Sequence, residues 1–323
     1  MEKTIIVVLS DLSDPQLAML DKLREEALVV IGNSAKSLEG SAPDAQVMLN
    51  WSGTLSLTRE VFLICDKLRW IHSRSVGLER TLFPELVASE VILTNGSGVF
   101  SPSLGEFAVA SILYFAKDLR RMIRNQQNGL WKQFDVTMVS GHTVGIVGYG
   151  DIGRAVASRV RPLGMKVLAL RRHAPAKEDR DPLVDRVYGP NQRIEMISQS
   201  DYLIVATPLN DETRGLIGEA EFSVMKETAV IINLARGPVI QERAMIKALS
   251  ESRIKGAALD VFDEEPLPAG HPFYEMENVL LSPHCADHTP DWLDNAMHLF
   301  LVQFERFRRG EPLLNIVNKQ LGY

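Results

Sequence analysis

The stretch TVGIVGYGDIGRAVA, residues 143–157, decides the fold. It places Gly148, Gly150 and Gly153 in a G-x-G-x-x-G pattern between an apolar strand and a helix rich in small residues. Gly148 would allow the tight turn, Gly150 the close approach of a pyrophosphate, and Gly153 the close packing of helix on strand. The helix amino terminus would bind that anion through free N–H groups. The stretch predicts a dinucleotide-binding unit, and a glycine-rich turn without a ligand is the alternative.

The next strand ends in a run of basic residues, MKVLALRRHAP (165–175). In a dinucleotide site, a carboxylate at this strand end binds the 2′-hydroxyl of NAD, whereas an arginine accommodates the 2′-phosphate of NADP. Arg171 stands 23 residues after Gly148, and Arg172 and His173 follow it. Guanidinium groups bind phosphate through paired, charge-assisted hydrogen bonds. The run therefore predicts a preference for NADP(H), with NAD(H) as the second coenzyme, and a solvated basic surface is the alternative.

Strand-like and helix-like segments alternate on both sides of this unit. Alternation of this kind predicts parallel sheets covered by helices, and we expect two doubly wound α/β domains. The expected strands are Thr4–Leu9, 45–49, 68–72, 91–94, 143–148, 166–171, 201–207, 229–235, 256–261 and 278–283. The expected helices are 15–27, 58–65, 103–117, Asp151–Val160, 241–252 and 290–309.

The composition is that of a globular protein without a nucleic-acid or membrane partner. The 323 residues include 35 basic and 41 acidic side chains, a net charge of −6, so there is no global basic footprint for nucleic acid. Cys65 and Cys285 are the two cysteines, which favours a reducing compartment over a disulfide framework. No metal-ligand spacing, targeting segment or apolar run of membrane-spanning length is recognisable. We expect a cytoplasmic protein without a metal.

Three later stretches carry a family resemblance: NLARGPVI (233–240), LDVFDEEP (259–266) and SPHCADHT (282–289). With the glycine loop, they make the chain resemble the D-isomer-specific 2-hydroxyacid dehydrogenases over nearly its full length, closest in type to the NADP-preferring glyoxylate/hydroxypyruvate reductases. The resemblance implies a Rossmann dinucleotide-binding domain over 101–289. It also implies a discontinuous, flavodoxin-like substrate domain over 1–100 and 290–323, with catalysis in the cleft between the two domains.

The resemblance places the catalytic residues at Arg236, Glu265 and His284. Reduction of a 2-keto acid needs a hydride at the carbonyl carbon and a proton at its oxygen. His284 would donate the proton, Glu265 would orient the imidazole, and Arg236 would hold the substrate carboxylate. Each residue also has a plainer interpretation, as a turn arginine, a solvated carboxylate and a structural histidine.

The resemblance also implies binding residues. The backbone N–H groups of the loop Ser75, Val76 and Gly77 would bind the substrate carboxylate, with Trp51 and Phe100 as pocket walls. For Trp51, a place in the core is equally open. The implied coenzyme contacts are Gly148, Tyr149, Gly150, Asp151, Ile152, Gly153, Arg171, Arg172, Thr207, Pro208, Leu209, Ala235, Arg236, Asp260, His284 and Ala286.

Two departures from the family pattern concern coenzyme and substrate. Many relatives carry Asp where this chain has Arg171, and small residues where Asp287 and His288 follow Cys285. We expect reduction of glyoxylate, hydroxypyruvate or pyruvate to D-2-hydroxy acids. The alternative is an NAD(H)-sensing binding protein of the corepressor type.

The family also implies a homodimer built on the coenzyme domain. The expected contacts are the helix 103–117 and the arm that follows it, residues 120–134, in which Leu130 and Trp131 stand among polar residues.

Overall fold

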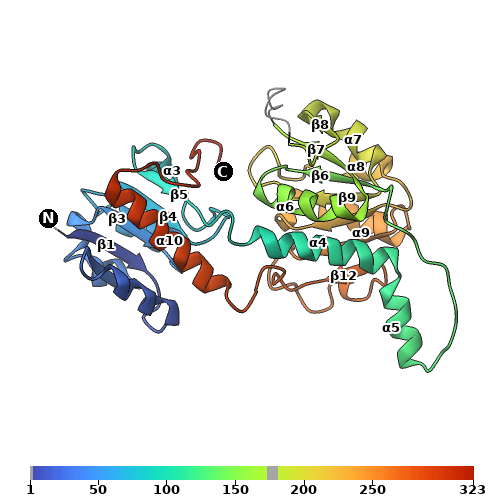
Figure 1. The fold of residues 1–323 in the computed structure, drawn as a ribbon, viewed down its shortest axis with the longest axis horizontal. Helices are drawn as coiled ribbons and strands as arrows, with labels where there is room; N and C mark the ends of the chain where they lie inside the picture. Colours follow the sequence, from blue (N-terminus) through green and yellow to red (C-terminus); the bar gives the residue numbers. More distant parts are fainter. Residues whose placement is uncertain (1–2, 173–180) are drawn as a thin grey trace. The chain divides into compact units, whose positions relative to one another are not determined.

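The computed structural model describes residues 3–172 and 181–323, and the chain divides into two compact units (Figure 1). Unit 1 comprises Met1–Val99 and Thr289–Tyr323, and unit 2 comprises Phe100–His288. His173, which follows the two arginines in the sequence, lies outside the described residues. Among the described residues, no helix combines the length and apolarity that a membrane crossing requires.

Unit 1 is built on a parallel sheet with the strand order β2-β1-β3-β4-β5. This is the flavodoxin-like order. β2 forms one edge of the sheet beside β1, and β3, β4 and β5 follow on the other side of β1. The strands are β1 (Thr4–Leu9), β2 (Ala27–Gly32), β3 (Val47–Asn50), β4 (Trp70–Ser73) and β5 (Ile92–Thr94).

Helices cover both faces of the unit 1 sheet. On one face, α10 (Trp292–Arg309) stacks Phe300 on Trp70 of β4, with ring centroids 5.5 Å apart, and the 3-10 helix η1 (Pro15–Leu23) joins the same core. The other face packs on α1 (Ala35–Leu38), α2 (Leu55–Phe62), α3 (Pro84–Val87) and the 3-10 helix η2 (Ala42–Asp44).

The expected helix over 15–27 is wrong in type and in extent. The segment is a 3-10 helix that ends at Leu23, and Ala27 already begins strand β2. The reason lies in the sequence ALVVIG: its branched side chains suit a strand, and its whole length pairs in parallel with β1. β2 is an edge strand with half-buried side chains, so its sequence shows little alternation between apolar and polar residues.

Unit 2 is built on a parallel sheet with the order β12-β11-β10-β9-β6-β7-β8. The chain order reverses between β6 and β9, as in the doubly wound dinucleotide-binding fold. The strands are β6 (Thr143–Val147), β7 (Lys166–Leu170), β8 (Arg186–Tyr188), β9 (Tyr202–Val205), β10 (Val230–Asn233), β11 (Gly256–Leu259) and β12 (Val279–Leu281). Together the two sheets confirm the predicted fold class.

Two layers of helices enclose the unit 2 sheet (Figure 1). α4 and α6 pack so closely that a Cβ at Gly105 would lie 3.0 Å from the Ala155 carbonyl oxygen. The helices are α4 (Ser101–Ala116), α5 (Leu119–Gln127), α6 (Asp151–Val160), α7 (Arg193–Gln199), α8 (Glu219–Val224) and α9 (Glu242–Ser250). Short 3-10 helices are η3 (Arg161–Leu163), η5 (Pro190–Gln192), η6 (Gly237–Val239) and η7 (Pro272–Tyr274).

Candidate active site and coenzyme site

The glycine loop between β6 and α6 has the shape of a phosphate cradle. Gly148 has φ +92°, and a Cβ there would lie 2.6 Å from the Thr207 Cα. A Cβ at Gly153 would lie 2.7 Å from the Gly148 carbonyl oxygen, so helix and strand touch at this point. At Gly150, by contrast, a Cβ would meet no atom within 4 Å. The open space therefore lies beside the amino terminus of α6, where backbone N–H groups favour an anion, and the loop fits a pyrophosphate.

A polar network beside this loop was not predicted from the sequence. The Tyr149 hydroxyl donates to Asp181 Oδ2 at 3.1 Å, and Arg154 Nε donates to the same oxygen at 2.7 Å. Burial raises the pKa of the Tyr149 phenol, and the nearby Asp181 carboxylate adds to the effect. The Tyr149 side chain is thus engaged with Asp181, so this residue would contact a coenzyme chiefly through its backbone.

The two arginines at the end of β7 differ in their surroundings. The Arg171 backbone N–H donates to the Tyr188 carbonyl at 3.0 Å and continues the pairing of β7 with β8. The Arg172 guanidinium forms an ion pair with Glu212 at 2.5 Å. The Arg172 side chain is 24% exposed and that of Glu212 71%. A carboxylate from the loop after β9 therefore lies against one of the two residues predicted to bind the 2′-phosphate.

His284 and Glu265 are brought together by the turns that follow β12 and β11. His284 Nδ1 and Glu265 Oε2 are 2.7 Å apart, and Glu265 Oε1 accepts a hydrogen bond from the Phe262 backbone at 2.9 Å. The second bond fixes the carboxylate, and the carboxylate in turn favours a proton on Nδ1. This arrangement leaves Nε2 as the imidazole nitrogen for exchanging a proton with a substrate.

Asp260 anchors the turn that carries His284. Its side chain is 2% exposed, and its Oδ1 accepts hydrogen bonds from Ser282 Oγ at 2.5 Å and from the backbones of Cys285 and Ala286 at 3.0 and 3.1 Å. Burial raises the pKa of Asp260, and these hydrogen bonds offset part of that rise. His284 itself has φ +51°, a left-handed conformation that is uncommon for residues other than glycine.

Arg236 comes from the turn that follows β10. Asn233 shapes this turn, because its amide donates to the Arg236 carbonyl at 3.1 Å and its Oδ1 accepts from Ala235 N at 3.0 Å. The next residue, Gly237, lies so near the following turn that a Cβ would stand 1.9 Å from the Phe262 carbonyl carbon. The turns that carry Arg236 and Glu265 are therefore in direct contact.

The remaining coenzyme residues named from the sequence lie at the same carboxyl-terminal edge of the unit 2 sheet. Thr207 touches the glycine loop, as described above, and the Pro208 carbonyl accepts from Thr213 Oγ1 at 2.6 Å. Leu209 packs against the core, and Ala235 is buried.

In unit 1, the loop 75–77 follows β4. Its carbonyl groups are occupied: Ser75 O accepts from Gly96 N at 3.2 Å, and Val76 O accepts from the Asn95 side chain at 3.1 Å. Within the described part of the chain, no acceptor meets the backbone N–H of Val76 or of Gly77. Two donors are therefore available to an anion on this loop.

Trp51 and Phe100 are both largely buried. Trp51 is 2% exposed, and its Nε1 donates to Asp14 Oδ2 at 2.7 Å. Phe100 is buried at the start of α4. Trp51 therefore has the hydrogen-bonded core position that the sequence left open, and one of its faces carries the Arg74 guanidinium.

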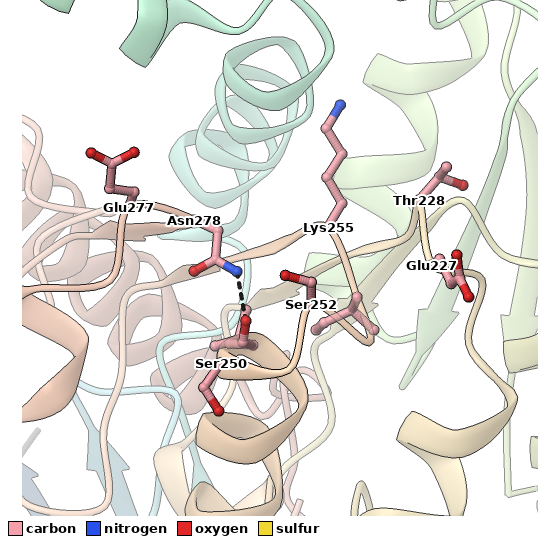
Figure 2. A pocket seen from close by; sticks show the side chains of 9 residues that line it. Glu227, Thr228, Ser250, Ser252, Lys255, Glu277 and Asn278 are labelled. Atoms are coloured by element: carbon pink, nitrogen blue, oxygen red, sulfur yellow. Dashed lines mark hydrogen bonds between the residues drawn. The ribbon is translucent and has the colours of Figure 1, made fainter.

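A separate hollow lies at the opposite edge of the unit 2 sheet (Figure 2). Its walls come from the segments that precede β10, β11 and β12, far from the glycine loop in the sheet. Asn278 donates to the Leu249 carbonyl at 3.1 Å, and Lys255 Nζ to the Phe115 carbonyl at 3.0 Å. These polar groups form hydrogen bonds that stabilise the fold, and we therefore assign no ligand to the hollow.

Comparisons with known proteins point to one family. The family profile described as "D-isomer specific 2-hydroxyacid dehydrogenase, NAD binding domain" matches residues 109–286. The chain is 34% identical to a glyoxylate reductase of Korarchaeum cryptofilum, over 81% of this chain and 80% of that protein. It is 30% identical to a D-3-phosphoglycerate dehydrogenase of Methanocaldococcus jannaschii, over 97% of this chain and 59% of that protein.

A solved structure extends the likeness to the whole chain. A D-isomer specific 2-hydroxyacid dehydrogenase from Xanthobacter autotrophicus Py2, solved with NADPH and MES, is 28% identical and covers all of both chains with a TM-score of 0.85.

Proposed function

The chain belongs to the D-isomer specific 2-hydroxyacid dehydrogenase family, and from this membership we propose that it reduces small 2-oxo acids to D-2-hydroxy acids with NADPH. The observation that carries the proposal is the 2.7 Å contact between His284 Nδ1 and Glu265 Oε2, on a turn adjoining that of Arg236. Unit 2 serves as the coenzyme domain and unit 1 as the substrate domain.

The coenzyme-binding residues are those at the carboxyl-terminal edge of the unit 2 sheet. A bound nicotinamide coenzyme supplies the hydride that reduces the carbonyl carbon. The loop 148–153 and the amino terminus of α6 hold the pyrophosphate. Thr207, Pro208 and Leu209 line the adenosine side, and Ala235, Asp260 and Ala286 the nicotinamide side. Of these, Asp260 contributes through the turn it anchors, because its carboxylate is buried and engaged with that turn.

The chain's own residues handle the proton and the substrate carboxylate. His284, protonated on both nitrogens, donates the Nε2 proton to the carbonyl oxygen as that oxygen gains negative charge. Glu265 holds and orients the imidazole through Nδ1. Arg236 binds the substrate carboxylate and polarises the carbonyl. In unit 1, the N–H groups of Val76 and Gly77 are donors for a substrate carboxylate.

The preference for NADPH rests on the basic end of β7. Arg171 stands where many relatives carry Asp, and Arg171 and Arg172 both follow the strand that neighbours the glycine loop in the sheet. The Xanthobacter relative was solved with NADPH, which supports the same assignment. The names of the curated relatives, glyoxylate reductase and D-3-phosphoglycerate dehydrogenase, point to different substrates, so the family alone does not choose the 2-oxo acid. A binding protein of the corepressor type is less favoured, because the site contains a complete proton-transfer pair.

Steady-state assays with glyoxylate, hydroxypyruvate and pyruvate, each with NADPH and NADH, test this function. We expect turnover by the wild type and a loss of roughly 10²- to 10⁴-fold in kcat for His284→Ala and for Glu265→Gln, since both act on proton transfer. Coenzyme affinity, measured by fluorescence titration, should stay within about twofold, because neither change touches the pyrophosphate cradle.

The matched control is His298→Ala, which removes an exposed histidine of α10 in unit 1. Turnover by His284→Ala equal to that of the control would remove His284 from the reaction. Tight coenzyme binding by a wild type that reduces none of the acids would instead favour the binding protein.

A further inference from the structure

Arg74 in unit 1 is a half-buried cation with no role in the function proposed above. Its guanidinium carbon lies 5.0 Å from the centre of the Trp51 ring and 5.4 Å from that of Trp292. Its Nε is shielded from solvent and has no hydrogen-bond partner. Among the described residues, no carboxylate forms an ion pair with Arg74. Two tryptophans thus hold the guanidinium, and its charge has no direct counter-ion.

The acidic group that acts on Arg74, Asp14, already has hydrogen-bond partners. Asp14 uses Oδ2 to accept from Trp51 Nε1 at 2.7 Å and Oδ1 to accept from Gln16 N at 3.2 Å. Burial lowers the pKa of Arg74; Asp14 opposes this effect, and the positive charge of Arg80 adds to it. A desolvated charge without a partner costs free energy, and a bound anion would recover that cost.

The position of Arg74 in the fold suggests which anion this is. Arg74 directly follows β4 and directly precedes Ser75, the first residue of the proposed carboxylate-binding loop. Trp70 and His72 of β4 both face Phe300 of α10. Side chains alternate along a strand, so Arg74 continues on this face and meets Trp292, where α10 begins. The cation is thus built into the same strand end as the substrate loop.

We propose that Arg74 binds a second anionic group, a carboxylate or a phosphate, at the far end of the 2-oxo acid. The proposal rests on the reductase function above and narrows its substrate class to acids with two anionic groups. Stacking between aromatic faces leaves the in-plane N–H groups of a guanidinium free for a bidentate contact with such a group. Glyoxylate and pyruvate lack the second anion and would be the poorer substrates.

Matched pairs of 2-oxo acids test the assignment. Oxaloacetate is compared with 2-oxobutanoate, which has the same chain length, and phosphohydroxypyruvate with hydroxypyruvate; the two pairs distinguish a carboxylate from a phosphate. We expect the wild type to prefer the doubly anionic member of at least one pair. In Arg74→Met, kcat/KM for that member should fall roughly ten- to hundredfold, mainly through KM, while the value for its partner changes by less than about threefold. Arg74→Lys should restore part of the preference.

Arg69→Met is the matched control. Arg69 immediately precedes β4, is exposed and lies 5.1 Å from the Phe307 ring, so this variant also loses an arginine–aromatic contact but at the opposite end of the strand. It should leave both members of each pair unchanged. Binding without turnover is measured by the quenching of tryptophan fluorescence when each 2-oxo acid is added to the enzyme with oxidised coenzyme.

The outcomes separate this proposal from the proposed function. Equal use of both members of each pair by the wild type, or an equal loss for both in Arg74→Met, would overturn the second anion site and leave the reductase standing. Arg74-dependent binding of the doubly anionic acids without reduction of any acid would support the site and overturn the reductase.

Discussion

At the scale of single residues, a contact could be predicted where both partners belong to motifs that the family resemblance assigns to one site. Glu265 and His284 stand in two such motifs, and the structure joins them at 2.7 Å. The Arg172–Glu212 pair joins residues 40 positions apart, and the sequence around Glu212 carries no sign of that contact. Arg74 is a similar case, because its two tryptophan neighbours come from distant segments.

The Arg172–Glu212 pair leads to a prediction about the coenzyme. The 2′-phosphate of NADPH would share Arg172 with the Glu212 carboxylate, and the two anions repel each other. Glu212→Gln should therefore tighten NADPH binding by up to about fivefold, the range of a surface ion pair, and leave NADH binding unchanged. Isothermal titration of NADPH, NADH and the fragment 2′,5′-ADP measures the effect, and Asp211→Asn on the same loop is the control. Weaker NADPH binding by Glu212→Gln would mean that Glu212 positions Arg172 for the phosphate.

Arg171→Asp tests the basic strand end directly. The new carboxylate would repel the 2′-phosphate and offer an acceptor to the ribose hydroxyl of NADH. The ratio of kcat/KM for NADPH over NADH should fall roughly ten- to hundredfold, since a hydrogen bond to a charged group is worth about 1.5–3 kcal/mol. Moderate salt should weaken the wild-type preference because the site is partly exposed. An unchanged ratio would return Arg171 and Arg172 to the surface interpretation.

At the scale of elements, strands were placed well where both faces are covered. The expected strand Thr4–Leu9 and helix Asp151–Val160 agree with β1 and α6 residue for residue. The two strands that were missed, β2 and β8, are edge strands with half-buried or charged side chains, so neither shows the apolar run of a central parallel strand. The same reason explains only the end of the expected helix over 15–27, because Ala27 already belongs to β2, whereas Pro15–Leu23 forms a 3-10 helix.

Substitutions at two glycines of the β6–α6 loop should have different effects, one on stability and the other on coenzyme binding. A Cβ at Gly153 would lie 2.7 Å from the Gly148 carbonyl, so Gly153→Ala should force helix and strand apart and lower the free energy of unfolding by about 1–3 kcal/mol. At Gly150 a Cβ meets nothing within 4 Å, so Gly150→Ala should keep the fold but narrow the space for the pyrophosphate. Urea unfolding and coenzyme titration separate the two effects. Unchanged coenzyme affinity in a folded Gly150→Ala protein would contradict the cradle.

At the scale of the whole molecule, the two parallel sheets could be predicted from the sequence because the connections between elements follow simple rules. Alternating strands and helices demand parallel sheets, and parallel sheets place the loops that follow their strands at one edge. In unit 2 this edge collects the glycine loop, Arg171 and the turns of Arg236, Glu265 and His284. Contacts that depend on side-chain packing, such as those of Arg74 with its two tryptophans, follow from no such rule, and only the three-dimensional structure shows them.

The arm of unit 2 carries the last prediction, a homodimer. No residue of α5 is buried, and in Figure 1 this helix leads away from the sheet of its unit. Trp131, just beyond it, is 98% exposed. Further exposed apolar side chains along the same segment are Leu119, Met122, Ile123, Leu130, Val136 and Met138. A monomer rarely leaves an apolar surface of this extent in water, and tryptophan is a frequent anchor of interfaces.

We expect sedimentation velocity at micromolar concentration to give a dimer, and the double change Leu130→Ser with Trp131→Ser to shift it toward monomer. Leu63→Ser is the control, since Leu63 is a 57% exposed leucine of unit 1, and it should leave the dimer intact. The folded state of each variant is checked by circular dichroism, so that dissociation is not confused with unfolding. A wild type that sediments as a monomer would exclude the dimer, and a dimer that survives the double change would move the interface away from the arm.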